Sequence, residues 1–342
     1  MSDIPTQMGA EAREAPAVLA RQAAALAFPV AQLAPLLRKR SARVVVTCAR
    51  GSSAHAATFG KHLIERHLGI PVSAAAPNVA SVYRRALALD GQLFLAISQA
   101  GRSVDIVETA AMARSSGAMT VAIVNDTASP LAQTCDVVLP MEAGPELSVA
   151  ATKSFIASLA VLLRLTAAWA DNATMQRGVD ALPERLAAAI ELDWSAAIAS
   201  LARARSVMTI GRGPTLAIAR EAALKLKEAC NLHAEAFSSA EFQHGPMALV
   251  EEAYPVLLFA PADEAATGIE TLRLDLARKG ASVFSTERLS GPAFLPALEP
   301  AQADADAICQ IQTFYQLLLA VAARRGSNVD RPRHLKKVTT TR

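Results

Sequence analysis

The sequence predicts an α/β protein with two tandem, doubly wound parallel sheets, and three observations support this fold class. Short apolar runs rich in Val and Ile alternate with helical patterns, as they do when helices cover both faces of a parallel sheet. Two distant stretches share one layout of strand, Arg-Gly turn and alanine-rich helix: VVVTCARGSSAHAATFGKHLIE and SVMTIGRGPTLAIAREAALKLKE. The chain has 342 residues, enough for about two domains, and the two stretches are separated by nearly half of that length.

The first half of the chain follows this alternation in order. Helical periodicity fills residues 11–40, and a mostly β-branched run at 43–49 then predicts a strand buried on both faces. Helices are predicted at 54–67 and 105–116. An apolar window at 154–170 contains an arginine and is short of a membrane span, so it predicts a core helix. The remaining expected strands are LGIPVSAAA, QLFLAIS, MTVAIVN and CDVVLP.

The second half repeats the pattern. A strand and turn at 205–215 lead into a helix at 216–229, and the strands YPVLLFAP and ASVFST flank a helix at 265–279. We expect a linker near 171–193 and a basic tail outside the sheet pattern. The predicted divisions are an N-terminal helical segment at 1–40, a first sheet domain at 41–172, a second sheet domain at 194–325 and the tail at 326–342.

Composition narrows the class of protein. Hydrophobic residues make up 52% of the chain and charged residues 19%, which is typical of a globular protein. A net charge of +3 gives no reason to expect a nucleic-acid partner. The four cysteines are far apart and form no CxxC, so we expect no metal, no redox cofactor and reduced thiols in the cytoplasm. The N-terminal stretch lacks the apolar region of a signal peptide, and no membrane partner is expected.

Two polar turns follow strands in the first half, and each precedes a helix. Helix N-termini offer free N–H groups and a partial positive charge, and ligands of open α/β sheets bind at these strand ends. The serines could instead only cap the helices, but hydroxyl pairs in both turns favour a bound phosphate. No Walker lysine motif or GxGxxG is present, which disfavours a nucleotide. The turns are Arg50-Gly51-Ser52-Ser53 and Ser98-Gln99-Ala100-Gly101-Arg102-Ser103.

One helix carries three charges on a single face. Glu221, Lys225 and Glu228 are spaced i, i+4, i+7, while Lys227 points elsewhere. A solvated stripe of ion pairs is one interpretation of this pattern. A carboxylate flanked by a lysine in a cleft is the other, and such a carboxylate is a candidate proton carrier.

Three further stretches have a structural and a functional interpretation each. His244 precedes a Gly-Pro turn in the predicted loop 238–250, and a lone histidine is more often structural. The polar loop 144–155 opens a helix, which Thr152 or Ser148 could cap. The sequence RPRHLKK in the tail could be a solvated basic end.

Taken together, these motifs resemble a known family. The motifs resemble, in the same order, the sugar isomerase (SIS) domains of glucosamine-6-phosphate synthase and its stand-alone relatives, above all the two-SIS-domain deaminases. The resemblance spans about Ala42 to Lys337 and implies a flavodoxin-like fold for both domains. The motifs are ARGSS, ISQAGRSVDIVETA, ELSVAATKSF, EAALKLKEACNLHAEAFSSAEFQHGPMALV and NVDRPRHLKK.

The resemblance implies a role for each motif. Glu228 corresponds to the carboxylate that moves a proton between C1 and C2, with Glu221 and Lys225 as its helix neighbours. His244 corresponds to the residue linked to ring opening, which reaches in from the partner subunit. Lys337 corresponds to the tail lysine that can form a Schiff base with a ketose. The implied phosphate and sugar contacts come from Ser52, Ser53, Ser98, Gln99, Gly101 and Ser103, and from the backbone of Val149 and Ala150.

The expected activity is that of an isomerising deaminase, which converts glucosamine 6-phosphate and water to fructose 6-phosphate and ammonia. Its expected partners are a sugar phosphate and a second copy of the chain in a homodimer with shared sites. Glucosamine-6-phosphate synthase carries an additional glutaminase domain with an N-terminal cysteine nucleophile. Here residue 2 is Ser and the first cysteine is Cys48 inside a strand, so we expect no glutamine hydrolysis. At Ala100 the family usually has Ser.

Other activities of the same scaffold stay open at this point. They are an ammonia- or partner-dependent glutamine-fructose-6-phosphate transaminase (isomerizing), a galactosamine-6-phosphate deaminase and a fructosamine-6-phosphate deglycase. A non-catalytic sugar-phosphate sensor is a further alternative from another class, because fold alone does not establish function. A sensor usually loses the acid, the histidine or the tail lysine, and this chain keeps all three.

Overall fold

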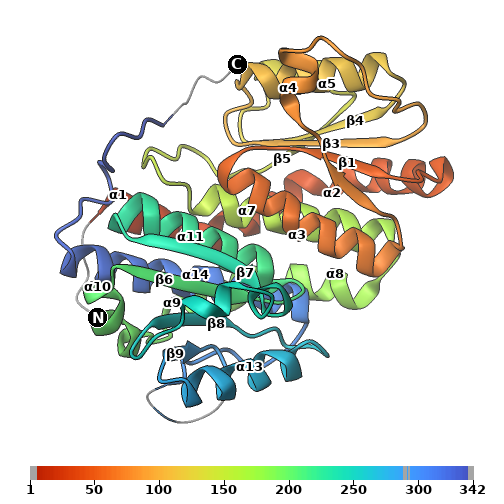
Figure 1. Ribbon diagram of the computed structural model, residues 1–342. Helices are drawn as coiled ribbons and strands as arrows, with labels where there is room; N and C mark the ends of the chain where they lie inside the picture. The colour runs from red at the N-terminus through yellow and green to blue at the C-terminus, as the bar shows by residue number, and fades with distance from the viewer. Residues whose placement is uncertain (1–5, 288–290, 292, 338–342) are drawn as a thin grey trace. The chain divides into compact units, whose positions relative to one another are not determined.

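A computed structural model describes residues 6–287, 291 and 293–337. These residues form two compact units, each built around one parallel sheet. The first-sheet unit comprises 17–146 and 154–180, and the second-sheet unit comprises 6–16, 147–153 and 181–337. Figure 1 shows the strands of each sheet with their helices.

The sheet of the first-sheet unit has the order β2-β1-β3-β4-β5, with every neighbouring pair parallel. β1 and β3 are buried along their whole length, as expected of strands with helices on both faces. Cys48 in β1 lies beside Ala96 in β3, so the two strands end near each other at the carboxyl edge. The strands are β1 (Val45–Cys48), β2 (Val72–Ala74), β3 (Leu93–Ser98), β4 (Met119–Val124) and β5 (Val137–Pro140).

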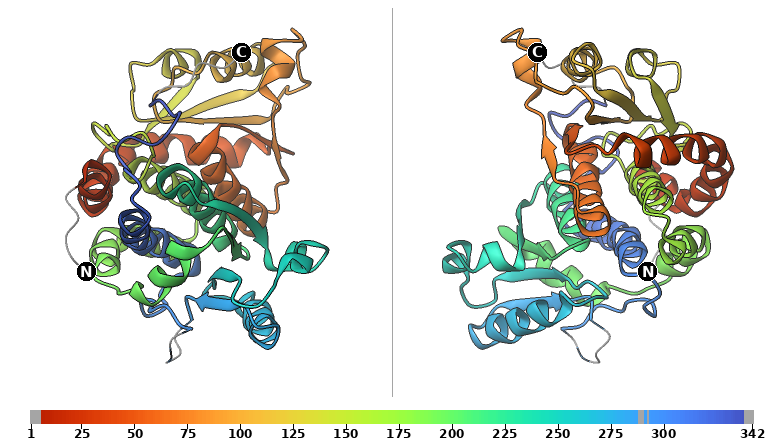
Figure 2. Two further views of the ribbon diagram at one scale, coloured as in Figure 1. Left: turned by 60° about the vertical axis from the view of Figure 1, so that its left-hand side comes forward. Right: turned by 90° about the vertical axis from the view of Figure 1, so that its right-hand side faces the viewer.

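Helices cover the first sheet (Figure 2). α3 ends on a left-handed Gly69, a conformation in which glycine carries no side-chain penalty. α7 is buried over most of its length, which confirms the predicted core helix. The helices of this unit are α2 (Ala15–Arg40), α3 (Gly51–Leu68), α4 (Pro77–Ser81), α5 (Val104–Ser115), α6 (Pro130–Thr134), α7 (Lys153–Trp169) and α8 (Ala173–Asp180).

α2 is long and apolar enough to cross a membrane by length and composition alone. One face of α2 is buried and the other is exposed, with Phe28 and Leu36 among its exposed residues. Gln22 is buried and its side-chain amide donates to the carbonyls of Met141 and Ala157, at 2.7 and 3.1 Å. Leu26 on the same helix is fully buried. A buried amide with two protein acceptors fixes this face against the rest of the first-sheet unit.

The sheet of the second-sheet unit has the order β7-β6-β8-β9 and is also fully parallel. The long helix α14 is buried along most of its length and contacts α1, α9, α10 and α11. The strands are β6 (Ser206–Gly211), β7 (His233–Ser238), β8 (Pro255–Phe259) and β9 (Ser282–Ser285). The helices are α1 (Gln7–Arg13), α9 (Leu182–Ile190), η1 (Ser195–Ala197), α10 (Ile198–Arg203), α11 (Thr215–Cys230), α12 (Ser239–Phe242), η2 (Pro246–Leu249), α13 (Ala266–Arg278) and α14 (Ala303–Arg324).

The predicted fold class is confirmed, and three details differ. The expected linker at 171–193 contains the helices α8 and α9. The predicted loop 238–250 holds α12 and η2, and the strand β7 before it was not predicted, because HAEAFS is only partly buried and lacks β-branched residues. The helix α14 was not predicted. It carries polar residues at several buried positions, so its sequence shows no simple apolar face.

Candidate functional site

The two predicted polar turns lie at one edge of the first sheet. β1 leads into α3, and the neighbouring strand β3 leads into α5. Arg50, just before α3, donates from Nε and Nη2 to Oδ2 of Asp105 in the first turn of α5, at 3.0 and 2.6 Å. Asp105 is almost fully buried. This ion pair ties the two turns together, and sequence reasoning did not find it because the pair is 55 residues apart.

Several polar side chains of these turns have no hydrogen-bond partner within the described part of the chain. Ser103 occupies the position before α5, yet its side chain does not cap that helix. Among the residues that the structure describes, the side chains of Ser53, Gln99 and Ser103 make no hydrogen bond. Ser98 Oγ accepts from the backbone N–H of Gly101 at 3.2 Å. The capping interpretation therefore fails for Ser103, and three hydrogen-bonding side chains remain for a ligand.

Gly101 shapes the turn through a close approach. Its φ is +62°, and a Cβ at this position would lie 2.6 Å from Cβ of Ser129. The Gly101 carbonyl accepts from the backbone N–H of Leu131 at 3.1 Å. Any side chain here would push the turn away from the α6 end, so glycine is required by geometry. Gly101 thus acts through its backbone.

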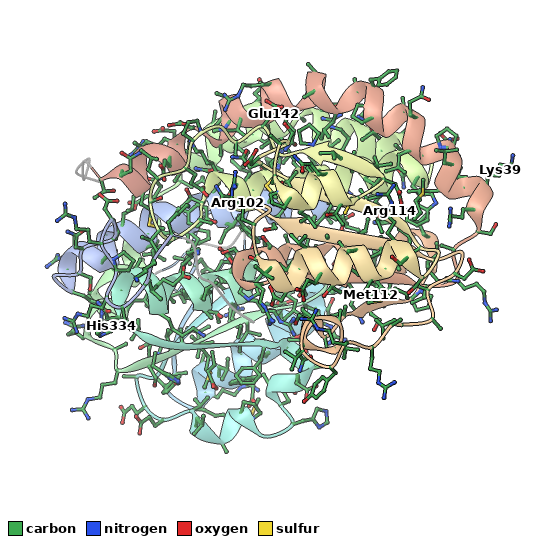
Figure 3. The ribbon with its side chains drawn as sticks, turned by 90° about the horizontal axis from the view of Figure 1, so that it is seen from above. Lys39, Arg102, Met112, Arg114, Glu142 and His334 are labelled. Carbon is green, nitrogen blue, oxygen red and sulfur yellow. The ribbon has the colours of Figure 1, made fainter. Side chains whose placement is uncertain are left out.

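The exposed cation of this turn does not point at the serines. Arg102 donates to Asp126 at 2.9 Å, and both side chains are substantially exposed. In Figure 3, Arg102 lies toward the end of α5 opposite to the labelled Met112 and Arg114. An exposed pair of this kind contributes little to stability. The positive character of the turn therefore comes from backbone N–H groups at the start of α3 and α5.

In the second-sheet unit, α11 places its three predicted charges together. Lys225 Nζ lies 2.6 Å from Oε2 of Glu228 and 3.3 Å from Oε1 of Glu221. Glu221 and Lys225 are buried, whereas the Glu228 side chain keeps 22% exposure. The interpretation as a solvated stripe is therefore wrong. Of the three residues, Glu228 is the one that reaches outward.

Burial and charge act on Lys225 in opposite directions. Burial disfavours the ammonium and would lower its pKa, but the carboxylates of Glu221 and Glu228 outweigh this and raise the pKa of Lys225. Lys225 therefore stays protonated at neutral pH. A fixed ammonium beside Glu228 places positive charge next to a carboxylate that a substrate can approach.

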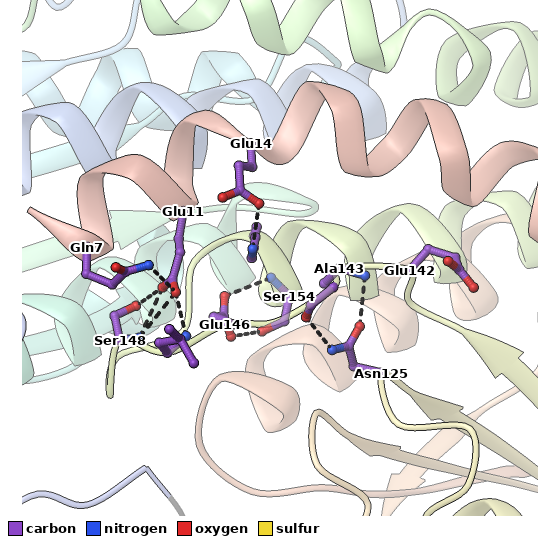
Figure 4. A network of polar contacts seen from close by, with 12 residues as sticks. Gln7, Glu11, Glu14, Asn125, Glu142, Ala143, Glu146, Ser148 and Ser154 are labelled. Carbon is purple, nitrogen blue, oxygen red and sulfur yellow. Dashed lines mark hydrogen bonds and ion pairs between the residues drawn. The ribbon is translucent and has the colours of Figure 1, made fainter.

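The polar loop 147–153 is held by a carboxylate from α1 (Figure 4). Glu11 is fully buried and accepts hydrogen bonds from the backbone N–H groups of Leu147 and Ser148 and from the Ser148 hydroxyl. Gln7 Nε2 adds a further hydrogen bond at 3.0 Å. Burial tends to raise the pKa of Glu11, but the hydrogen bonds from Ser148, Leu147 and Gln7 lower it overall.

The tail approaches the same loop. Lys337 Nζ donates to the Ser148 carbonyl at 2.7 Å, which brings this predicted lysine next to Val149 and Ala150. The carboxylate of Asp330 accepts from the backbone N–H groups of Gln7 and Met8, both at 2.9 Å. The tail is thus anchored on the first turn of α1.

Sequence reasoning missed Glu11 and misassigned Ser148. The Ser148 hydroxyl donates to Glu11 and so does not cap α7. In the first-sheet unit, Glu146 accepts from the Ser154 backbone N–H at 3.1 Å at the start of α7 (Figure 4). A signal for Glu11 was present: it lies on the same helical face as the buried residues Met8 and Ala12, where an acid needs partners.

His244 stands apart from these groups. It is exposed at the end of α12, and its backbone N–H donates to the Glu241 carbonyl at 3.0 Å. Within the described chain, no hydrogen bond joins it to another predicted site residue. Within the first-sheet unit the structure places the two serine turns side by side. Within the second-sheet unit it groups the three charges of α11, and it separately places Lys337 at the loop 147–153.

The described residues contain neither a candidate metal-binding cluster nor an exposed cysteine thiol. No group of three or more His, Cys, Asp or Glu side chains there could hold a metal ion. All four cysteines are free and buried. Burial raises the pKa of Cys48, Cys230 and Cys309 to about 12 and that of Cys135 to about 11. These thiols are therefore protonated and poor nucleophiles.

A family model described as "SIS domain" matches residues 36–168 and 200–287. The chain belongs to the SIS domain family. As an SIS protein it has one family domain around each sheet, and it groups with the phosphosugar isomerases of that family. The predicted resemblance is thereby confirmed.

Relatives with a curated name are glutamine–fructose-6-phosphate aminotransferases [isomerizing]. The protein of Caulobacter vibrioides is 36% identical over 320 residues, covering 86% of this chain and 51% of the relative. The protein of Symbiobacterium thermophilum is 35% identical over 325 residues, covering 88% and 52%. This SIS protein spans about half the length of the curated relatives that it matches.

Solved structures agree with the fold along the whole chain. A candidate phosphosugar isomerase of Silicibacter pomeroyi DSS-3 is 43% identical, with a TM-score of 0.91 over 95% of this chain and 100% of that one. Glucosamine-6-phosphate deaminase of Thermotoga maritima has a TM-score of 0.77 at 22% identity, covering 98% of this chain and 100% of that one. At that identity the second likeness concerns the fold alone.

Proposed function

We propose that this SIS protein is an isomerising deaminase that converts glucosamine 6-phosphate and water to fructose 6-phosphate and ammonia. The observation that carries the proposal is the α11 arrangement, in which a buried, charged Lys225 lies 2.6 Å from a partly exposed Glu228. An aldose–ketose proton transfer needs a carboxylate base and nearby positive charge for the enediolate-like intermediate.

The phosphate of the substrate is assigned to the serine turns. Ser53, Gln99 and Ser103 offer side chains that no described residue hydrogen-bonds, and α3 and α5 offer N-terminal N–H groups. Binding a group remote from C1 and C2 fixes the reacting carbons, and this binding energy lowers the barrier through positioning. The Arg50–Asp105 ion pair supports this role, because it holds the two turns in one arrangement.

Glu228 is assigned the proton transfer. It removes the C2 proton of the open-chain aldose and returns a proton to C1, while O1 gains a proton and the amine loses one, which leaves a ketose imine at C2. Water then attacks C2, the carbon–nitrogen bond breaks and ammonia leaves, so that atoms balance. Lys225 supplies positive charge beside the intermediate, and Glu221 holds Lys225 from its other side at 3.3 Å.

The remaining site residues take supporting roles. The backbone of Val149 and Ala150 meets the sugar hydroxyls, and Lys337 adds positive charge from the tail. His244 assists ring opening as a group from a second copy of the chain, and its exposure supports this assignment. The proposal therefore includes a homodimer with shared sites, in which an inactive Glu228→Gln chain and an inactive His244→Ala chain complement each other.

The cysteines support the direction of the reaction. Glutamine hydrolysis by a thiol nucleophile needs an accessible thiolate, and every cysteine of these 342 residues is buried with a raised pKa. None of these four cysteines therefore provides the thiolate that would release ammonia from glutamine. Release of ammonia needs only the groups assigned above.

The test is ammonia release from a panel of hexosamine 6-phosphates. Glucosamine 6-phosphate is expected to react, and Glu228→Gln is expected to lower kcat by about 10²–10⁴-fold while the sugar phosphate still binds. Glu235→Gln is the control, since Glu235 is exposed on β7 of the same unit. Activity retained in Glu228→Gln would remove Glu228 from the role of base. Ammonia from galactosamine 6-phosphate alone would assign the other epimer.

A second candidate function is the reverse reaction, synthesis of glucosamine 6-phosphate from fructose 6-phosphate. The curated relatives favour it, because they are named as aminotransferases and are 31–36% identical. Incubation with fructose 6-phosphate and ammonium, or with glutamine and a separate glutaminase, measures this direction. Net synthesis with glutamine but not with ammonium would replace deamination as the assigned function.

A further inference from the structure

A cavity of about 260 Å³ opens at the carboxyl edge of the second sheet, inside the second-sheet unit. It lies beside the loop that follows β8 and beside the residues that follow β9. α9 and α14 contribute further wall residues. None of the residues assigned to the proposed function lines it. Its apolar walls include Leu192, Trp194, Ala260, Ala266, Pro296 and Leu298.

The position of this cavity follows from the internal repeat. β3 lies next to β1 in the first sheet, and β8 lies next to β6 in the second. The segment 260–265 between β8 and α13 therefore occupies the place of the serine turn 99–103 between β3 and α5. Doubly wound sheets bind ligands at this edge. The repeat thus places a cavity at the second copy of a ligand-binding position.

The residues of the loop 260–265 disfavour a phosphate, which is the ligand proposed for the serine turn 99–103. Ala260-Pro261-Ala262-Asp263-Glu264-Ala265 contains no serine and no glycine, and it adds two acids. A phosphate would meet no free hydroxyl and two negative charges in this loop. The apolar lining of the cavity disfavours any ligand that brings its own charge.

The charged side chains around the cavity are held in ion pairs, although Arg185 Nε itself has no hydrogen-bond partner among the described atoms. Arg185 Nη2 donates to Asp306 Oδ1 at 2.6 Å, and Arg273 Nε donates to Glu287 at 3.1 Å. Gln310 Nε2 donates to the Ala260 carbonyl at 2.7 Å. Burial raises the pKa of Asp306 despite the arginine beside it, which agrees with a weakly polar surrounding. Most of the binding surface is therefore apolar.

Trp194 gives the cavity a rigid aromatic wall. Its Nε1 donates to the Pro296 carbonyl at 2.8 Å, and its ring lies 6.2 Å from the ring of Phe259. A ring held from two sides presents a fixed face for stacking. An engineered apolar cavity of about 150 Å³ holds one benzene ring. A cavity of about 260 Å³ therefore has room for two fused rings.

We propose that this cavity is a second binding site, which takes an uncharged, planar bicyclic aromatic molecule against Trp194. The site is separate from the sugar-phosphate chemistry and does not rest on it. Binding is driven by burial of the rings, and an added carboxylate weakens it because Arg185 in the cavity wall is already paired with Asp306.

Tryptophan fluorescence tests the proposal directly. The chain has two tryptophans, so Trp169→Phe leaves Trp194 as the only reporter. Quinoxaline, which is uncharged at neutral pH, is the probe, and quinoxaline-2-carboxylate is its charged match. Saturable quenching of Trp194 by quinoxaline is expected, with the carboxylate at least about tenfold weaker because of its charge.

Two variants of the Trp169→Phe protein locate the binding. Ala266→Leu fills the cavity and is expected to weaken quinoxaline binding at least about tenfold. Ala265→Leu is the control, because Ala265 has similar partial exposure but does not line the cavity. Quenching that fails to saturate, equal binding of the carboxylate, or unchanged binding in a folded Ala266→Leu protein would each overturn the proposal. Circular dichroism checks that each variant is folded.

Discussion

The carboxyl edges of the two sheets in this SIS protein differ in whether their polar side chains are paired with other protein groups. At the first edge, the side chains of Gln99 and Ser103 have no hydrogen-bond partner among the residues that the structure describes. At the second edge, the loop 260–265 is rich in alanine, and the charged residues Asp306 and Glu287 are paired with arginines. Unpaired donors at a strand end have a cost unless a ligand or water meets them. The same topology therefore supports the proposed anion site in one copy and an apolar cavity in the other.

The largest expected effect lies in the second-sheet unit, where charges are buried in pairs. Lys225→Met leaves Glu221 buried beside Glu228 without the ammonium that balances them. The free energy of unfolding is expected to fall by about 3–5 kcal/mol, as when one partner of a buried pair is removed. Urea unfolding followed by circular dichroism measures this change. Lys227→Met on the exposed face is the control, and equal losses in both variants would contradict the burial argument.

The sequence allowed the fold class and the serine turns to be predicted, for a physical reason. Strand, turn and helix follow each other locally, so apolar runs and the hydroxyls of Ser98 and Ser103 are visible within a few residues. The spacing of Glu221, Lys225 and Glu228 was visible in the same way. Their burial was not, because it depends on the packing of α14 against α11.

Contacts between distant segments account for what sequence reasoning missed. Glu11 binds a loop 137 residues away, and Arg50 binds Asp105 across 55 residues. No local pattern specifies either partner. The cavity at Trp194 was missed for the same reason, since its walls come from separate elements that meet only in the fold.

The next test measures how much the hydrogen-bonded carboxylate of Glu11 contributes to stability. Its hydrogen bonds to Leu147 and Ser148 are made to a charged acceptor, so Glu11→Gln is expected to cost about 1.5–3 kcal/mol of unfolding free energy. Thermal unfolding with Glu191→Gln as the comparison measures it. Glu191 is exposed in the same unit, so a smaller loss is expected there.

The pH dependence of stability sharpens the same test. The folded pKa of Glu11 lies below its ordinary value of 4.5, so its stabilising contribution is complete above pH 4.5. That contribution is lost as the pH falls through the lower, folded pKa. The stability difference between the native protein and Glu11→Gln is therefore expected to shrink below pH 4.5. A difference that grows on acidification would contradict the lowered pKa.

Arg50 tests the organisation of the first edge. Arg50→Met removes the ion pair to the buried Asp105 and frees the two turns from each other. Since the Arg50 side chain is 52% exposed, the expected loss of stability is modest, about 1 kcal/mol. The affinity for phosphate is expected to fall about tenfold, measured by calorimetry with the sugar phosphate. Arg84→Met, which removes an exposed pair to Glu108, is the control and is expected to leave affinity unchanged.

The smallest expected effect compares one position in each loop. Ala100 stands in the serine turn, at a position where the family resemblance leads us to expect Ser, and its side chain is partly exposed. One added hydroxyl donor contributes about 1 kcal/mol, so Ala100→Ser is expected to tighten sugar-phosphate binding about fivefold. Ala262→Ser places the same hydroxyl in the exposed part of the second loop and is expected to change nothing, because no phosphate binds there. Calorimetric titration of both variants measures the difference. An unchanged affinity in Ala100→Ser would mean that this position does not face the phosphate. A higher affinity for the sugar phosphate in Ala262→Ser would contradict the proposed difference between the two sheet edges.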